Sequence, residues 1–196
     1  MTTANSPLTA RPMRILGISG SLRRDSHNTR LLRAASDALP AGAELIAWDG
    51  LAGLPIFDED LEADRPERVE EFFAAVQQAD AILIATPEYN ASLPGGLKNA
   101  LDWASRPFPD NVLKDKPTAV IGASTGLFGA VWAQAEARKV LKASGAHVIE
   151  SELPVGMADA AFDADGGLAD PELAARLADL IGDLAREASA PVEVAT

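Results

Sequence analysis

Short apolar runs alternate with longer amphipathic segments along this chain. The runs are continuously apolar, which is typical of strands buried on both faces of a parallel sheet. They predict strands at residues 13–18, 44–48, 81–85, 118–122 and 146–149. Between them, apolar residues recur every three or four positions, which predicts helices at residues 28–39, 66–78, 95–104, 130–143 and 171–187.

This alternation predicts an α/β fold with a doubly wound, five-stranded parallel sheet in the order 2-1-3-4-5 and helices on both faces. A ligand is then expected where the strand order reverses, beyond the carboxyl ends of the first and third strands. Residues 49–64 lack periodicity and contain Gly, Pro and several acids, so we expect a surface loop there. We expect one domain over residues 13–188, with flexible tails at 1–12 and 189–196.

The composition narrows the classes of partner. The 196 residues carry a net charge of −12, with a pI near 4.5, which argues against nucleic acid and against an anionic membrane surface. The chain has no Cys, which excludes disulfides, thiolate metal sites and Cys nucleophiles. No apolar run has the length of a signal peptide or membrane span, and we expect a cytoplasmic protein.

Three polar loops follow predicted strands, at residues 17–29, 86–94 and 122–129. In a parallel sheet, the ends of neighbouring strands lie at one edge, so the three loops are expected to form one cleft. The chemistry of their residues then indicates what the cleft binds.

The first loop offers hydroxyl, amide and guanidinium groups just before a helix, whose free N–H groups attract anions. Its spacing matches neither a G-x-G-x-x-G fingerprint nor a P-loop, which favours a monophosphate over a dinucleotide or triphosphate. The same groups suit a simple helix cap and turn equally well. Arg24 is expected to face solvent. The candidate residues are Ser19, Ser21, Arg23, Ser26 and Asn28.

The second loop combines a rigid turn, an aromatic side chain and backbone amides, in Pro87, Glu88, Tyr89 and Asn90. Such a loop can lie along a flat heterocycle and bind its edge. An ordinary turn before a helix is the alternative interpretation.

In the third loop, the small residues Ser124 and Gly126 would let the backbone approach a ligand. A Gly-Ser turn that only starts a helix explains them nearly as well.

These segments resemble the NADPH-dependent FMN reductase family, in particular its flavodoxin-like chromate and quinone reductases. The resemblance covers roughly residues 13–153 and is most specific in PEYNASLPGGLKNALDWAS, residues 87–105. GSLRRDSHNT resembles the phosphate loop of the family, and GASTGLFGAVWAQAEARKVL resembles its third segment. The resemblance implies a flavodoxin-like fold and a bound FMN.

The resemblance also assigns roles to residues. Ser19, Ser21, Arg23, Ser26 and Asn28 would hold the FMN phosphate; Pro87, Glu88, Tyr89 and Asn90 would line the isoalloxazine ring; Ser124 and Gly126 would close the site. NADPH or NADH would supply hydride through the flavin to a quinone, azo compound, nitroaromatic or chromate. Family members commonly form dimers or tetramers, so a homodimer or homotetramer is implied.

No side chain is assigned as a catalytic acid or base, and no metal is expected. His27 is explained by its place in the phosphate loop, and His147 by an edge strand. Backbone N–H groups near Asn90 and Ser124 are expected to stabilise the reduced ring. Arg23 and Arg106 are candidates for binding the 2′-phosphate of NADPH.

One departure from the family concerns the third segment. Trp132 stands where close relatives often carry Arg, and Leu127-Phe128 replaces smaller residues. The loss of this positive charge weakens the expectation of small anionic acceptors such as chromate. The alternative function is a flavodoxin-like electron carrier without its own NAD(P)H oxidation. A module that has lost its ligand is disfavoured by the polar residues in all three loops.

Overall fold

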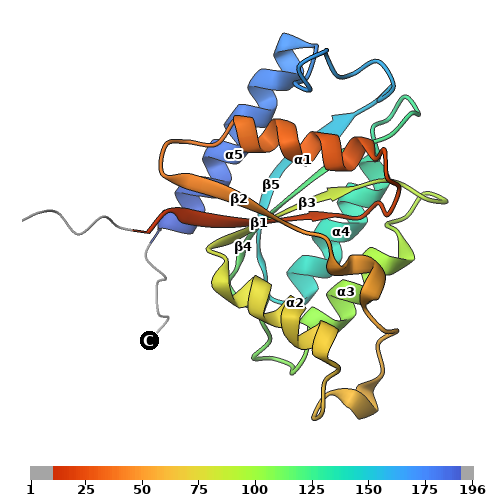
Figure 1. The fold of residues 1–196 in the computed structure, drawn as a ribbon, viewed down its shortest axis with the longest axis vertical. Coiled ribbons are helices and arrows are strands. Elements are labelled where there is room, and N and C mark those ends of the chain that lie inside the picture. The colour runs from red at the N-terminus through yellow and green to blue at the C-terminus, as the bar shows by residue number, and fades with distance from the viewer. Residues whose placement is uncertain (1–10, 191–196) are drawn as a thin grey trace, which may run out of the picture.

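A computed structural model describes residues 11–190 and contains a five-stranded parallel sheet in the order β2-β1-β3-β4-β5 (Figure 1). The predicted fold class and strand order are confirmed. The strands are β1 (Met13–Ser19), β2 (Ala43–Trp48), β3 (Ala81–Thr86), β4 (Pro117–Ala123) and β5 (His147–Val155). The helices are α1 (His27–Asp37), α2 (Glu67–Gln78), α3 (Gly95–Ala104), α4 (Val131–Ala143) and α5 (Pro171–Ser189).

The helices cover the sheet in two layers. Helices α1 and α5 pack on one face, and α2, α3 and α4 pack on the other, each layer with its own apolar core (Figure 1). Every residue of the central strand β3 is buried, which explains its continuously apolar sequence. Within residues 11–190, no helix is long and apolar enough to span a bilayer.

The last strand is longer than predicted. It runs to Val155, whereas the apolar pattern ends at Ile149. β5 lies at the sheet edge, where exposed residues such as Glu150 interrupt the apolar pattern, and its pairing with β4 shifts register between Thr118 and Val120. The position of His147 on an edge strand agrees with the prediction.

The segment 49–64 is more ordered than a surface loop. It contains two short 3₁₀ helices, Gly50–Gly53 and Glu59–Leu61, and it buries Leu51 and Leu54. The Pro55 carbonyl accepts hydrogen bonds from Asn99 Nδ2 at 2.8 Å and from Trp103 Nε1 at 2.9 Å. These contacts with α3 are remote in sequence, so no local pattern indicates them.

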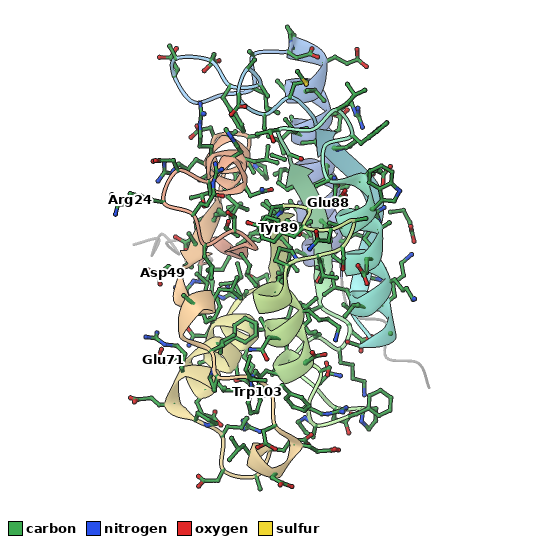
Figure 2. All side chains as sticks on the ribbon, turned by 90° about the vertical axis from the view of Figure 1, so that its right-hand side faces the viewer. Arg24, Asp49, Glu71, Glu88, Tyr89 and Trp103 are labelled. Carbon is green, nitrogen blue, oxygen red and sulfur yellow. The ribbon has the colours of Figure 1, made fainter. Side chains whose placement is uncertain are left out.

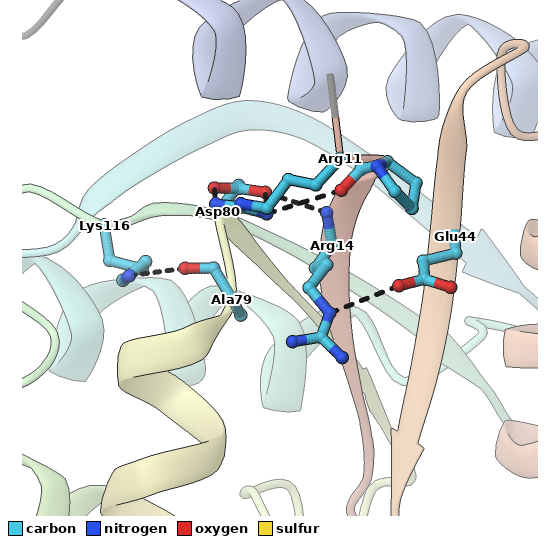
Figure 3. Close-up of polar contacts among 7 residues, drawn as sticks. Arg11, Arg14, Glu44, Ala79, Asp80 and Lys116 are labelled. Atoms are coloured by element: carbon cyan, nitrogen blue, oxygen red, sulfur yellow. Dashed lines mark hydrogen bonds and ion pairs between the residues drawn. The ribbon is translucent and has the colours of Figure 1, made fainter. Parts of the chain in front are cut away.

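A polar cluster joins the amino ends of the strands, at the opposite end of the sheet from the three loops (Figure 3). The Asp80 carboxylate accepts hydrogen bonds from the Arg11 guanidinium at 2.6 and 2.8 Å and from the Arg14 N–H at 2.8 Å. Lys116 Nζ donates to the Ala79 carbonyl at 2.6 Å. Arg11 thus contacts the domain, while residues 1–10 and 191–196 of the expected tails lie outside the described residues.

The Arg11 guanidinium, helped by the Arg14 N–H and the charge of Lys116, holds the pKa of Asp80 below its usual range, against the opposing effect of burial. A lowered pKa in the folded state adds stability above the unfolded carboxyl pKa of about 4, and this stability is lost as the pH falls through the folded pKa. Asp80→Asn should therefore lower the free energy of unfolding by about 1–2 kcal/mol at pH 7. Urea unfolding should show this difference shrink below about pH 4; an equal difference at pH 7 and pH 3 would contradict the role of charge.

Candidate functional site

The three polar loops meet at the carboxyl edge of the sheet and line one open cleft. The Gly20 N–H donates to the Ala85 carbonyl at 2.8 Å, and a Cβ on Gly20 would lie 3.1 Å from Pro87, so the first and second loops are closely packed. Figure 2 shows Glu88 and Tyr89 together on the second loop. The cleft is lined by Ser21, Arg23, Ser26, His27, Asn28, Pro87, Glu88, Tyr89, Ala123, Ser124 and Thr125.

In the first loop, the Ser26 side chain caps α1. Its Oγ accepts the backbone N–H groups of Asn28 and Thr29, both at 3.2 Å. Since this oxygen only accepts in the cap, its own hydrogen is free to donate to a ligand. A second hydroxyl pair lies nearby, with Thr29 Oγ1 3.2 Å from Ser19 Oγ. The helix terminus and these hydroxyls form an environment suited to an anion.

Arg23 is the cation of this loop that lines the cleft. One of its guanidinium nitrogens donates to the Asp25 carbonyl at 2.9 Å, and no carboxylate between residues 11 and 190 forms an ion pair with it. The guanidinium is therefore available to an anion in the cleft. Arg24 is exposed and points away from the protein, as expected (Figure 2).

Asn28 lies in the cleft wall, but its side chain is already occupied. Its Nδ2 donates to the Ala123 carbonyl and its Oδ1 accepts the Ala123 N–H, both at 2.9 Å. Asn28 and Ala123 are both buried. The side-chain amide thus joins the start of α1 to the end of β4, and positions the first loop against the third.

The second loop forms a tight turn. The backbone groups of Tyr89 and Ser92 exchange hydrogen bonds at 3.0 and 3.1 Å, and Asn90 and Ala91 have φ values of 54° and 61°. Two successive positive φ values define a type I′ turn, whose central N–H groups point outward. Tyr89, with 49% of its surface exposed, presents its ring beside the cleft.

Glu88 connects this loop to α4. Its Oε2 accepts the backbone N–H groups of Trp132 at 3.1 Å and Ala133 at 3.2 Å. Ala130, at the N-cap position, has a left-handed backbone and makes no side-chain cap of its own. The carboxylate therefore caps the helix from a distant segment, and its charge is favourable at the positive end of the helix dipole.

Glu88→Ala should lower the free energy of unfolding by about 1–2 kcal/mol, because two helix N–H groups lose their acceptor. Glu88→Gln keeps one acceptor oxygen but loses the charge, so it should lower the free energy of unfolding by less than Glu88→Ala. Urea unfolding measures both changes, and faster hydrogen exchange at the start of α4 should accompany the first. Equal stability of Glu88→Ala and the wild type would show that the cap contributes nothing.

The third loop is held against the end of β5. The Ser124 N–H donates to the Val155 carbonyl, and the Met157 N–H donates to the Gly126 carbonyl, both at 3.0 Å. Ser124 Oγ accepts the Gly126 N–H at 3.1 Å. Ser124 lines the cleft and Gly126 lies beyond it on the exposed part of the loop.

The cleft includes residues that the predicted site omits: His27, Ala123 and Thr125. Their position in the three loops was the only available signal. Arg106, expected near the cleft, is not part of it. It follows the far end of α3, where its Nε lies 2.9 Å from Glu62 Oε1 and its guanidinium lies over the Phe57 ring.

The arrangement suits a ligand with an anionic group at α1 and a flat group beside the Tyr89 turn. Residues 13–160 match the model of a family described as NADPH-dependent FMN reductase. The chain belongs to this family. It is 44% identical over 160 residues to an NAD(P)H-dependent FMN reductase from Pseudomonas aeruginosa, covering 81% of this chain and 85% of that protein.

Two further similar proteins are also named as reductases or oxidoreductases. A quinone reductase from Escherichia coli K12 is 38% identical over 131 residues, covering 66% of this chain and 69% of that protein. The solved structure of FerB, a flavoenzyme NAD(P)H:(acceptor) oxidoreductase from Paracoccus denitrificans, superposes with a TM-score of 0.79 at 35% identity, covering 90% of this chain and 97% of that one.

The residues of this family member fit a flavin mononucleotide. The free hydrogen of Ser26 Oγ and the Arg23 guanidinium, which forms no ion pair within residues 11–190, suit a phosphate at the N-terminus of α1. The Tyr89 turn offers a ring face and outward N–H groups for a flat heterocycle.

Proposed function

We propose that this protein is an NAD(P)H-dependent oxidoreductase that binds FMN in the cleft and reduces a quinone or a similar acceptor. The observation that carries the proposal is the meeting of the capped N-terminus of α1 with the Tyr89 turn at one cleft. Bound there, the flavin would supply the chemistry, taking hydride from NADPH or NADH and returning electrons to the acceptor.

In this proposal, the first loop binds the FMN phosphate. Ser26 donates its hydroxyl hydrogen, Arg23 supplies a positive charge, and the N-terminus of α1 adds its dipole. Ser19 and Ser21 shape the loop through their 3.3 Å contact. Asn28 acts indirectly by positioning the loop through Ala123.

The second and third loops position the ring. Pro87 is buried, Glu88 ties the loop to α4, and the turn at Asn90 directs N–H groups outward. These backbone donors are fixed before the ligand arrives, so they stabilise negative charge on a reduced ring without reorganisation. Ser124 confines the ring from the side of β4 and β5, and the Gly126 N–H, which donates to Ser124 Oγ, holds that side chain in place.

A patch of exposed apolar side chains supports a homo-oligomer. Leu127, Phe128, Trp132 and Met157 are each more than half exposed, and the rings of Phe128 and Trp132 pack edge to face at 5.2 Å. Trp132, in the first turn of α4, donates its backbone N–H to Glu88, so a second copy seated on this patch would border the cleft. Light scattering should give a dimer or tetramer, and Trp132→Glu should shift it towards the monomer; a monomeric wild type would contradict this assembly.

Steady-state NADPH oxidation by the FMN-loaded protein, with a quinone present, tests the function. A reductase oxidises many equivalents of NADPH per protein, whereas an electron carrier shows almost no consumption above free FMN. NADH in place of NADPH determines the co-substrate preference. Absence of turnover with either nucleotide, in a protein that retains its flavin, would favour the carrier.

A further inference from the structure

Glu136, on the second turn of α4, binds the second loop across 44 positions of sequence. Its Oε2 accepts the Ser92 hydroxyl hydrogen at 2.5 Å, and the Leu93 N–H lies 3.4 Å away. The first contact has the length of a charge-assisted hydrogen bond, which is the stronger kind. No cation between residues 11 and 190 forms an ion pair with this carboxylate, whereas Arg138 on the same helix pairs with Glu152 on β5. The charge of Glu136 is therefore directed at the loop.

The second loop is thus tied to α4 on both sides of its turn. Glu88, before the turn, accepts N–H groups at the start of α4, and Glu136 reaches from α4 to Ser92, the last residue of the turn. Helix α3, which follows the loop, packs with α4 on the same face of the sheet (Figure 1). The two carboxylates therefore fix both ends of the turn to one helix.

This turn needs external support because its backbone is strained. Asn90 and Ala91 have φ values of 54° and 61°, and for a residue such as alanine the left-handed region costs roughly 1–2 kcal/mol. Such strain persists only where the surrounding structure holds it. Ser92 closes the turn through its backbone, which exchanges hydrogen bonds with Tyr89, and it binds Glu136 through its side chain. The Ser92 hydroxyl is therefore the point at which α4 supports the closed turn.

We propose that Glu136 is a positioning residue for the flavin ring: through Ser92 it keeps the Tyr89 turn closed, so that the outward N–H groups of the turn are fixed in the cleft. The inference rests on the proposed binding of FMN there. It adds a residue that neither local sequence nor the lining of the cleft indicates.

The charge of the flavin ring determines the direction of the effect. Fixed N–H groups stabilise a ring that carries negative charge more than a neutral one, and the reduced ring is the more negative form. A loosened turn should therefore weaken the binding of reduced FMN more than that of oxidised FMN. The phosphate contacts of the first loop are the same in both forms, so most of the affinity for oxidised FMN should remain.

The midpoint potential of bound FMN, measured by reductive titration against a reference dye, tests this role. Glu136→Ala should weaken the binding of reduced FMN about tenfold relative to oxidised FMN, which lowers the two-electron potential by about 30 mV. Ser92→Ala should lower the potential similarly, because it removes the other partner of the contact. Glu136→Gln keeps an acceptor oxygen for the Ser92 hydroxyl, so its potential should stay close to that of the wild type.

Hydrogen exchange of the FMN-free protein provides a second readout that needs neither flavin nor turnover. The N–H groups of Tyr89 and Ser92 close the turn, so their exchange reports how often it opens. Both should exchange about tenfold faster in Glu136→Ala than in the wild type. The double variant Ser92→Ala/Glu136→Ala should exchange no faster than either single variant, because both substitutions break the same contact.

Glu152→Ala is the matched control. It removes the partner of Arg138 on the same helix, so it should lower the free energy of unfolding but leave both the FMN potential and the exchange of the turn unchanged.

Two results would overturn the inference while leaving the proposed function intact. One is a wild-type potential and wild-type exchange of the turn in Glu136→Ala, which would make the contact merely structural. The other is an equal change in Glu152→Ala, which would assign the effect to a general disturbance of α4. A wild-type protein that takes up no FMN would contradict the proposed function and this inference together.

Discussion

Replacing Asn28 by alanine is expected to lower the free energy of unfolding by about 2–4 kcal/mol and to weaken FMN binding by at least tenfold. The substitution removes both partners of Ala123, leaving a buried N–H and a buried carbonyl unsatisfied at the end of β4. It also releases the start of α1 from the third loop, so the Ser26 hydroxyl loses its fixed position. Urea unfolding and FMN fluorescence titration measure the two effects.

Asn111 provides a matched control. It lies before the amino end of β4, away from the cleft at the carboxyl ends of the strands. It is also buried and bonds to backbone groups, donating to the Ser144 carbonyl at 3.0 Å and accepting the Leu113 N–H at 2.9 Å. Asn111→Ala should cause a comparable loss of stability and leave FMN affinity unchanged, when both are measured where the variants are folded. Wild-type FMN affinity in Asn28→Ala would refute the positioning role of Asn28.

Gly129→Ala is the second substitution with a large expected effect. Gly129 has a φ of 58°, and a Cβ there would lie 2.5 Å from Pro154 C and Val155 N. Backbone strain and a clash with β5 both destabilise the variant, so Gly129→Ala should lower the free energy of unfolding by about 2–5 kcal/mol. Because this close approach holds the third loop against β5, FMN affinity should fall as well. Thermal or urea unfolding measures the first effect and fluorescence titration the second.

Gly42 separates the two causes. Its φ is 85°, but a Cβ there would meet no atom within 4 Å. Gly42→Ala should therefore show the effect of backbone strain alone. It should lower the free energy of unfolding by about 1 kcal/mol and leave FMN affinity unchanged. If Gly129→Ala and Gly42→Ala lower the free energy of unfolding equally, the third loop accommodates the methyl group. The close packing of Gly129 would then not be what holds this loop against β5.

The sequence predicts the fold well because the three central strands, β1, β3 and β4, are mostly buried. These strands are largely apolar runs, and their order follows from alternation with helices. Prediction was weakest where burial is one-sided or tertiary. The apolar pattern predicts that edge strand β5 ends at Ile149, and the burial of Leu51 depends on contacts with α3 rather than on local pattern.

For the site, the sequence predicts which loops form the cleft but not how their side chains are used. The placement of Ser26 as a cap and of Tyr89 beside the cleft follows from local sequence. The bonds of Asn28 to Ala123 and of Glu88 to α4 join residues 95 and about 44 positions apart. The sequence explains His27 by its place in the phosphate loop, and no local pattern indicates its contact with Asp159, 132 positions away. Only the fold brings these groups together.

The visible spectrum of the purified protein, recorded without oxygen before and after addition of NADPH, tests the central claim most directly. Purified protein, reconstituted with FMN if needed, should show flavin bands at about 450 nm that bleach when NADPH is added. Bands that persist would indicate a flavin carrier without NADPH oxidation. A colourless protein that takes up no added FMN would contradict the account of the cleft.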